Sequence, residues 1–195
     1  MKINGKTKGI ICIIAAAFGF SLMSVFVRLA GDLPSFQKAF FRNFIALIFM
    51  TGTLLKKKTG FLPRKENALY LLGRSLFGTI GIVCNFYAID RLVLADANML
   101  NKLSPFFAII FSALLLKEKP DIVQLCAVAA AFAGTVMIVK PGFTGMSFFP
   151  AAVGTLGGAG AGIAYTFVRK LGCRGEDSTK IIFWFSAFST AVCLG

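Results

Sequence analysis

The sequence predicts an all-α integral membrane protein, a multi-pass helical bundle, and three observations lead to this fold class. Hydrophobic residues make up 57% of the 195 residues and charged residues only 15%, whereas soluble domains carry about 25% charged residues. The apolar residues fall into runs that approach the roughly 20 residues a helix needs to cross a bilayer. Most prolines and charges lie in the short gaps between these runs. Lipid is therefore expected to be the main solvent of the fold.

Seven apolar runs are predicted to form membrane helices, six of them full and the last partial. In chain order they are 10–30, 36–55, 68–89, 93–116, 122–139, 150–168 and 180–195. Turn residues or charges occupy the gaps, as in GDLPS at 31–35 and KKKTGFLPRKE at 56–66. Pro105 alone lies in the interior of a run, where its missing N–H leaves a backbone carbonyl one turn earlier unpaired.

The distribution of lysine and arginine predicts the orientation. When the gaps are assigned to alternate sides, 14 of the 21 basic residues fall on the side of the N-terminus and 4 on the other. The remaining three, Arg42, Arg74 and Lys102, lie deeper within runs and are assigned to neither side. Cytoplasmic loops are enriched in positive charge, so the N-terminus is expected in the cytoplasm and the protein in the inner or plasma membrane. This spread of charge over many gaps argues against a nucleic-acid partner.

The residue inventory also excludes several kinds of chemistry. The sequence has no histidine, the commonest metal ligand and the usual general base. None of the five cysteines forms a C-x-x-C pair, and the eight acids are scattered. No metal, cofactor or enzymatic activity is therefore expected. A membrane-embedded enzyme acting on a lipid-linked substrate remains the alternative from another class.

The stretch NMLNKLSPFF at 98–107 places polar residues inside the fourth run. If the run is one helix, Lys102 lies about 15 Å from its outer end, near the middle of the bilayer. A charge at that depth costs roughly 3 kcal/mol unless it faces a polar interior. Asn98, Asn101 and Pro105 share the face of Lys102 at 100° per residue. This face predicts a substrate site, although Lys102 could instead be a structural residue and the asparagines only hydrogen bonds between helices.

Three further polar residues lie within runs and are candidates for the same site. Arg42 is in the second run, and Arg74 and Asn85 frame a stripe in the third run with Gly78 and Gly81 between them. Small residues at such spacing allow close helix packing and turn the polar ends toward the bundle. The alternatives are that Arg42 extends to the outer surface, that Arg74 anchors the helix at the interface, and that Asn85 only joins helices.

A weak internal repeat is visible in the sequence. FVRLAG at 26–31 is matched by FVRKLG at 167–172, and five predicted helices separate the two. An odd number of helices inverts the second copy, and inverted repeats are typical of secondary transporters with a midplane binding site. The glycine-rich run AVGTLGGAGAGIAY at 152–165 is expected to provide a smooth face for helix packing.

In combination these segments resemble the EamA family of the drug/metabolite transporter superfamily. The resemblance rests on AAAFGFSLMSVFVR, FFRN, RSLFGTIGIVCNFYAIDRL, VAAAFAGTVMIVKPG and, above all, ADANMLNKLSPFFAIIFSALLLKEKP, with its mid-helix Pro105 and Glu118 near the cytoplasmic end. It covers 9–140 as one five-helix repeat and 150–195 as the start of a second. It implies a ten-helix transporter built from inverted repeats, of which this chain would end in the seventh helix. The small multidrug-resistance members of the superfamily need a glutamate in the first helix. Because 10–30 contains no acid, their proton-driven export of lipophilic cations is not expected here.

The sequence thus predicts a secondary transporter that moves a small polar metabolite by alternating access. Lys102, Asn98 and Asn101 would line the midplane and Arg42 the outer vestibule. Three cations expected to be buried or half-buried, Lys102, Arg42 and Arg74, against one acid, Asp96, favour an anionic or carboxylate-bearing solute. The expected partners are this solute and the lipid bilayer, with a homodimer left open. A non-transporting membrane subunit is a further alternative.

Overall fold

The computed structural model describes residues 5–58, 60–116, 121–139 and 148–194, and every secondary-structure element within them is helical. The fold class predicted from the sequence is confirmed. The elements are α1 (Gly5–Leu29), α2 (Ser35–Lys57), the 3₁₀ helix η1 (Lys65–Asn67), α3 (Ala68–Arg91), α4 (Leu94–Asn101), α5 (Ser104–Leu116), α6 (Ile122–Val139), α7 (Phe148–Cys173) and α8 (Ser178–Leu194). Glu118 and Lys140 lie outside the described residues.

Five helical segments are long and apolar enough to cross a membrane. They are Gly9–Leu29, Ser35–Lys57, Lys65–Arg91, Leu94–Leu115 and Phe148–Cys173, while α6 and α8 contribute shorter apolar segments. Each matches one of the predicted runs to within a few residues. The chain is therefore a multi-pass helical membrane protein, as its composition indicated.

The fourth run corrects one expectation, because it is not a single helix. Only Lys102 and Leu103 separate α4 from α5, and their N–H groups bond to carbonyls three residues earlier, at 3.0 and 3.1 Å. Pro105 lies in the first turn of α5, where a missing N–H costs little. The proline thus begins a second helix instead of interrupting one, and Lys102 lies at the break.

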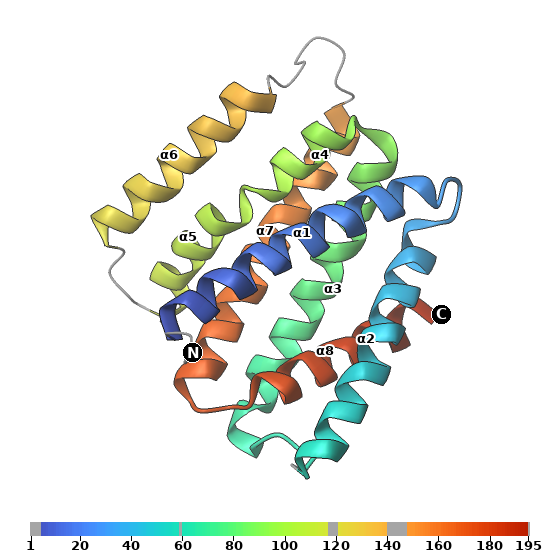
Figure 1. The fold of residues 1–195 in the computed structure, drawn as a ribbon, viewed down its shortest axis with the longest axis vertical. Coiled ribbons are helices and arrows are strands. Elements are labelled where there is room, and N and C mark those ends of the chain that lie inside the picture. The colour runs from blue at the N-terminus through green and yellow to red at the C-terminus, as the bar shows by residue number, and fades with distance from the viewer. Residues whose placement is uncertain (1–4, 59, 117–120, 140–147, 195) are drawn as a thin grey trace.

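Helices α3 and α7 pack on each other along the middle of the bundle (Figure 1). Glycines on both helices allow their backbones to meet. A methyl group added at Gly81 would lie 3.0 Å from the Ala161 nitrogen, and one at Gly160 would lie 3.0 Å from the Phe77 carbonyl oxygen. These glycines are needed at the crossing because any side chain would push the two backbones apart.

The other helices surround this central pair. α2 packs on α8 and α5 packs on α7, while α6 lies at the edge of the bundle beside α5 (Figure 1). Buried apolar side chains form two clusters. One, containing Val27, Phe86 and Ile89, lies near the α1–α2 turn, and we call this end the outer end after the orientation that the sequence predicts. The other joins Leu71 to Leu171 and Ile181 at the inner end.

Candidate functional site

A small polar cavity of about 80 Å³ lies between the two apolar clusters, and six helices contribute to its wall. We call it the central cavity. Four of the residues predicted from the sequence line it: Arg42, Arg74, Asn85 and Asn101. They come from α2, α3 and α4, so the fold gathers side chains that are up to 59 positions apart in the sequence.

Arg42 reaches the central cavity from the outer half of α2. Its guanidinium donates a hydrogen bond to Asn43 Oδ1 at 3.1 Å and contacts Met23 Sδ at 3.3 Å. Asn43 is itself fully buried and donates to Ser189 Oγ on α8 at 2.9 Å. The neighbouring amide therefore positions Arg42 without neutralising it.

Arg74 enters the cavity from α3 and contains a buried nitrogen without a hydrogen-bond partner among the described residues. Its guanidinium carbon lies 4.1 Å from the centre of the Phe185 ring, which is cation–π geometry. Its Nε is buried and has no hydrogen-bond partner among the described residues. Buried N–H groups are almost always paired, so an unpaired donor at this position calls for an explanation.

Gly78 makes room for Arg74. A methyl group at Gly78 would collide with the Arg74 guanidinium and would lie 2.9 Å from the Phe185 ring. The glycine stripe of α3 therefore serves two purposes, since Gly81 meets α7 while Gly78 accommodates a side chain. The sequence pattern suggested only the first.

The electrostatics of the central cavity are unbalanced. Two guanidinium groups line it, and within the described part of the chain no acid does. The two salt bridges found among the described residues, Lys38–Asp90 and Lys57–Asp177, involve neither arginine. Two like charges in a poorly solvated space repel each other more strongly than in water. An anion held between them would relieve this repulsion and accept charge-assisted hydrogen bonds.

Two amides and one phenol complete the polar lining. Asn85 is buried and Asn101 half-buried, and both can donate to or accept from a ligand. Tyr165 of α7 also lines the cavity, although the sequence reasoning missed it. It continues the small face of α7 at 158 and 161 by helical spacing, so extending that stripe by one turn would have found it.

Lys102, Asn98 and Pro105 do not line the central cavity. Lys102 and Pro105 are exposed on the surface of the described chain. Asn98 is half-buried, and its Oδ1 accepts a hydrogen bond from Ser24 Oγ of α1 at 3.3 Å. The structure therefore separates the predicted residues into four that converge and three that lie elsewhere, and a binding role stays a prediction for all seven.

A second, larger cavity of about 870 Å³ opens at the outer end. Charged residues of both signs line this outer vestibule: Arg28, Asp32, Asp90 and Arg91. Arg91 also lies 5.6 Å from the ring centre of Tyr87, another lining residue. In contrast to the central cavity, the vestibule carries balanced charge.

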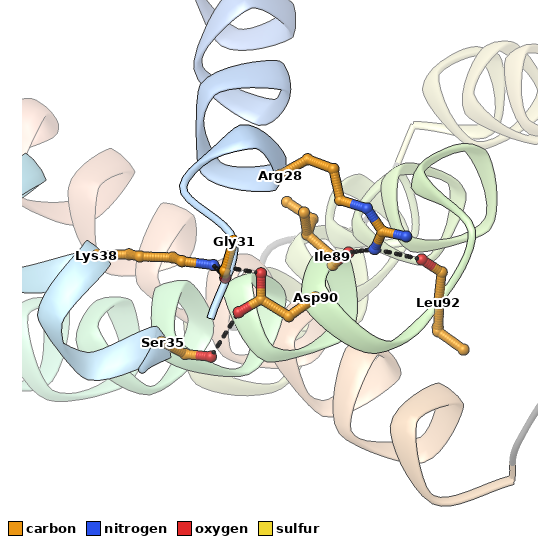
Figure 2. Close-up of polar contacts among 7 residues, drawn as sticks. All are labelled: Arg28, Gly31, Ser35, Lys38, Ile89, Asp90 and Leu92. Carbon is orange, nitrogen blue, oxygen red and sulfur yellow. Dashed lines mark hydrogen bonds and ion pairs between the residues drawn. The ribbon is translucent and has the colours of Figure 1, made fainter. Parts of the chain in front are cut away.

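A buried ion pair borders the vestibule and ties α2 to α3 (Figure 2). Lys38 Nζ lies 2.6 Å from Asp90 Oδ1, and the lysine side chain is only 3% exposed. Lys38 also donates to the Gly31 carbonyl at 2.9 Å, and Ser35 Oγ donates to Asp90 Oδ2 at 3.1 Å.

Arg28 makes a second connection at the same end. It donates to the Ile89 and Leu92 carbonyls at the end of α3 (Figure 2). The sequence alone did not single out Asp90 or predict either connection. These residues fix the outer turns in place.

Apolar helices around a small cavity with two arginines in its lining define a polytopic helical membrane protein. Residues 7–140 match the family model of the EamA-like transporter family. The chain belongs to this family, and the resemblance seen in its sequence is confirmed.

Curated relatives support the same grouping. The chain is 35% identical over 188 residues to the pseudopaline exporter CntI of Pseudomonas aeruginosa (strain UCBPP-PA14), a match that covers 95% of this chain and 65% of the exporter. It is 30% identical over 176 residues to mouse solute carrier family 35 member G1, covering 84% of the chain and 48% of the relative. A riboflavin transporter of Brucella anthropi is 27% identical over 131 residues, or 66% of the chain and 46% of that protein. The chain thus spans less than two thirds of the length of these relatives. No solved structure matches it.

Proposed function

We propose that this protein is a secondary transporter that moves a small polar, anionic solute across the cytoplasmic membrane by alternating access. The observation that carries the proposal is the pair Arg42 and Arg74. Both line one cavity, one of them has a buried Nε without a partner among the described residues, and no acid in the described part lines the same cavity. A carboxylate or phosphate supplies the missing negative charge and accepts hydrogen bonds from guanidinium groups.

The small size of the central cavity supports motion during the cycle. At about 80 Å³ it is far smaller than the outer vestibule of about 870 Å³ and smaller than the roughly 300–1,000 Å³ of ordinary ligand pockets. A metabolite fits only after the surrounding helices separate. The proposal therefore treats this structure as a state in which the site is contracted, and the larger outer vestibule as the side from which solute exchanges.

Family membership favours transport over the alternatives. The relatives carry the names exporter, solute carrier and transporter, and the solutes named for two of them, pseudopaline and riboflavin, differ. The names support a carrier without selecting its solute. A membrane-embedded enzyme would need a nucleophile with a base or a bound metal, and the sequence has no histidine.

The orientation and the repeat organisation belong to the same proposal. The excess of lysine and arginine on one side supports a cytoplasmic N-terminus. The division into a first repeat at 9–140 and the beginning of an inverted second repeat at 150–195 supports a binding site between the repeats. Whether two copies associate is not part of the proposal.

Ligand binding by the purified protein tests the anionic preference without requiring transport. A panel of small carboxylates, phosphates, neutral polyols and amines is screened by thermal unfolding, because a ligand of the folded state raises the midpoint. At least one anion is expected to stabilise the wild type. Arg74→Gln and Arg42→Gln are expected to weaken that anion about ten-fold or more each, the usual effect of losing a charged hydrogen bond.

Arg64→Gln is the matched control, because Arg64 lies in the α2–α3 connection away from the central cavity. Proteoliposome flux of the same anion, with and without Arg74→Gln, then links binding to transport. Stabilisation by amines alone, or equal affinity for the anion in all three variants, would contradict the proposed site.

A further inference from the structure

A third hollow lies between α3 and α8, beside the connection that precedes α3. Its volume is about 570 Å³, and it shares no lining residue with the central cavity. Its walls are mainly apolar side chains, among them Leu71, Leu72 and Phe188. Leu72 is 53% exposed, so the groove opens on the surface of the helical bundle. An apolar groove on a membrane-spanning flank has the shape and chemistry to hold an acyl chain.

Positive charge is confined to one end of this α3–α8 groove. Lys65 lines it at the end formed by the α2–α3 connection, and Lys180 donates to the nearby Leu62 carbonyl at 3.2 Å. Residues 56–66 contain five basic residues and one acid. Ser75, at the other end, lies about 10 Å farther along α3 by helix rise. The groove therefore has a cationic mouth and an apolar interior.

Trp184 indicates the depth of the mouth. Its ring lines the groove, and its Nε1 donates to the Phe61 carbonyl at 3.0 Å. Tryptophan with one apolar side and one hydrogen-bonded edge is typical of the membrane–water interface. The mouth thus lies where phospholipid head groups are found, on the side with the basic loops.

We propose that the α3–α8 groove binds an anionic phospholipid, with an acyl chain between α3 and α8 and the phosphate at Lys65. Anionic lipid attracts basic residues at the membrane surface, and the cationic mouth and apolar interior of the groove match the head group and part of an acyl chain of such a molecule. The site is independent of the transported solute, so it goes beyond the proposed transport function.

The fluorescence of Trp184 offers a direct test, because it is the only tryptophan in the sequence. The protein is reconstituted into phosphatidylcholine vesicles that contain a small fraction of either bromine-labelled phosphatidylglycerol or bromine-labelled phosphatidylcholine. Bromine on an acyl chain quenches tryptophan on contact. Phosphatidylglycerol is expected to quench at about five-fold lower mole fraction than phosphatidylcholine.

Two variants separate the specific site from general attraction. Lys65→Gln is expected to remove most of the preference for phosphatidylglycerol. Lys56→Gln, which removes a neighbouring charge that does not line the groove, is expected to retain it. High salt provides a second measurement that needs no variant, because it screens the phosphate contact and should lower the preference in the wild type.

Three outcomes would overturn the proposal. Equal quenching by both lipids would mean ordinary lipid contact without selection. No quenching by either would mean that protein fills the groove. An equal preference in Lys65→Gln and Lys56→Gln would mean that Lys65 does not hold the phosphate. None of these outcomes bears on transport through the central cavity.

Discussion

The outer end and the central cavity solve the same physical problem in opposite ways. At the outer end, buried Lys38 has a carboxylate at 2.6 Å and a backbone carbonyl at 2.9 Å. In the central cavity, Arg74 has an aromatic ring, and its buried Nε is without a partner among the described residues. Both cations are removed from water, but only the first is compensated by its own protein. A compensated cation holds structure together, and we expect an uncompensated one to attract a ligand of opposite charge.

The largest expected effect comes from removing the compensated cation. Lys38→Met leaves Asp90 without its partner in a largely buried site, which typically destabilises a protein by about 3 kcal/mol. Unfolding of the detergent-solubilised protein measures the loss. The double variant Lys38→Met/Asp90→Leu should recover most of it, because no unpaired charge then remains. A single variant as stable as the wild type would refute the structural role of this pair.

A smaller loss is expected from Gly78→Ala, which changes no charge. The added methyl group collides with the Arg74 guanidinium and the Phe185 ring, and such overpacking costs about 1–3 kcal/mol. Because Arg74 must move, anion binding should weaken at the same time. Gly19→Ala is the matched control, since a methyl group there meets nothing within 4 Å. Unchanged anion affinity in Gly78→Ala would mean that the position of Arg74 does not matter to the site.

Removing the charge of Arg74 itself is expected to raise the stability of the protein, in contrast to the two preceding substitutions. Arg74→Met removes a buried, uncompensated charge, so the protein without ligand should become more stable by about 1 kcal/mol. The same unfolding assay measures this gain, and it should disappear when a bound anion stabilises the wild type. A loss of stability comparable to that of Lys38→Met would show that Arg74, like Lys38, mainly holds the fold together.

The smallest effect is expected at the exposed inner end. Lys57 lies 3.8 Å from Asp177, and both side chains are about a third to a half exposed. Lys57→Gln should therefore change stability by less than about 1 kcal/mol. A change as large as that of Lys38→Met would show that exposure does not separate the two ion pairs.

Asp177 adds a pH dependence to the same region. The Thr179 backbone N–H, and secondarily the Thr179 hydroxyl, hold the pKa of Asp177 below its usual value. Since the folded-state pKa is lowered, the carboxylate contributes stability above its ordinary pKa of about 3.9. That contribution is lost as the pH falls through the lower folded value. Asp177→Asn should therefore lower stability slightly at neutral pH and remove most of the acid-induced loss below about pH 4, so the two unfolding profiles should converge as the pH falls.

The helices could be predicted from the sequence because their signal is local. A run of apolar residues bounded by turn residues identifies a membrane helix without knowledge of its neighbours. The same holds for Arg42, Arg74, Asn85 and Asn101, since a polar residue inside a span tends to face the protein interior.

The remaining features depend on contacts that local patterns do not encode. Lys102 was placed at mid-membrane on the assumption of one straight helix, and the turn before Pro105 removes that assumption. The pairing of Lys38 with Asp90 joins residues 52 positions apart. Periodicity on one helix specifies neither the partner helix nor its height, so this pair required the assembled bundle.

The position of Phe185 has a consequence for biosynthesis. The ring that covers the Arg74 guanidinium is encoded 111 residues later, which a ribosome adding about 5–20 residues per second reaches after roughly 5–20 seconds. During this interval the third helix must enter the membrane with an arginine whose aromatic cover has not been made. Until α8 has been made, the Arg74 side chain in a nascent chain must therefore be solvated by the translocation machinery or by lipid head groups.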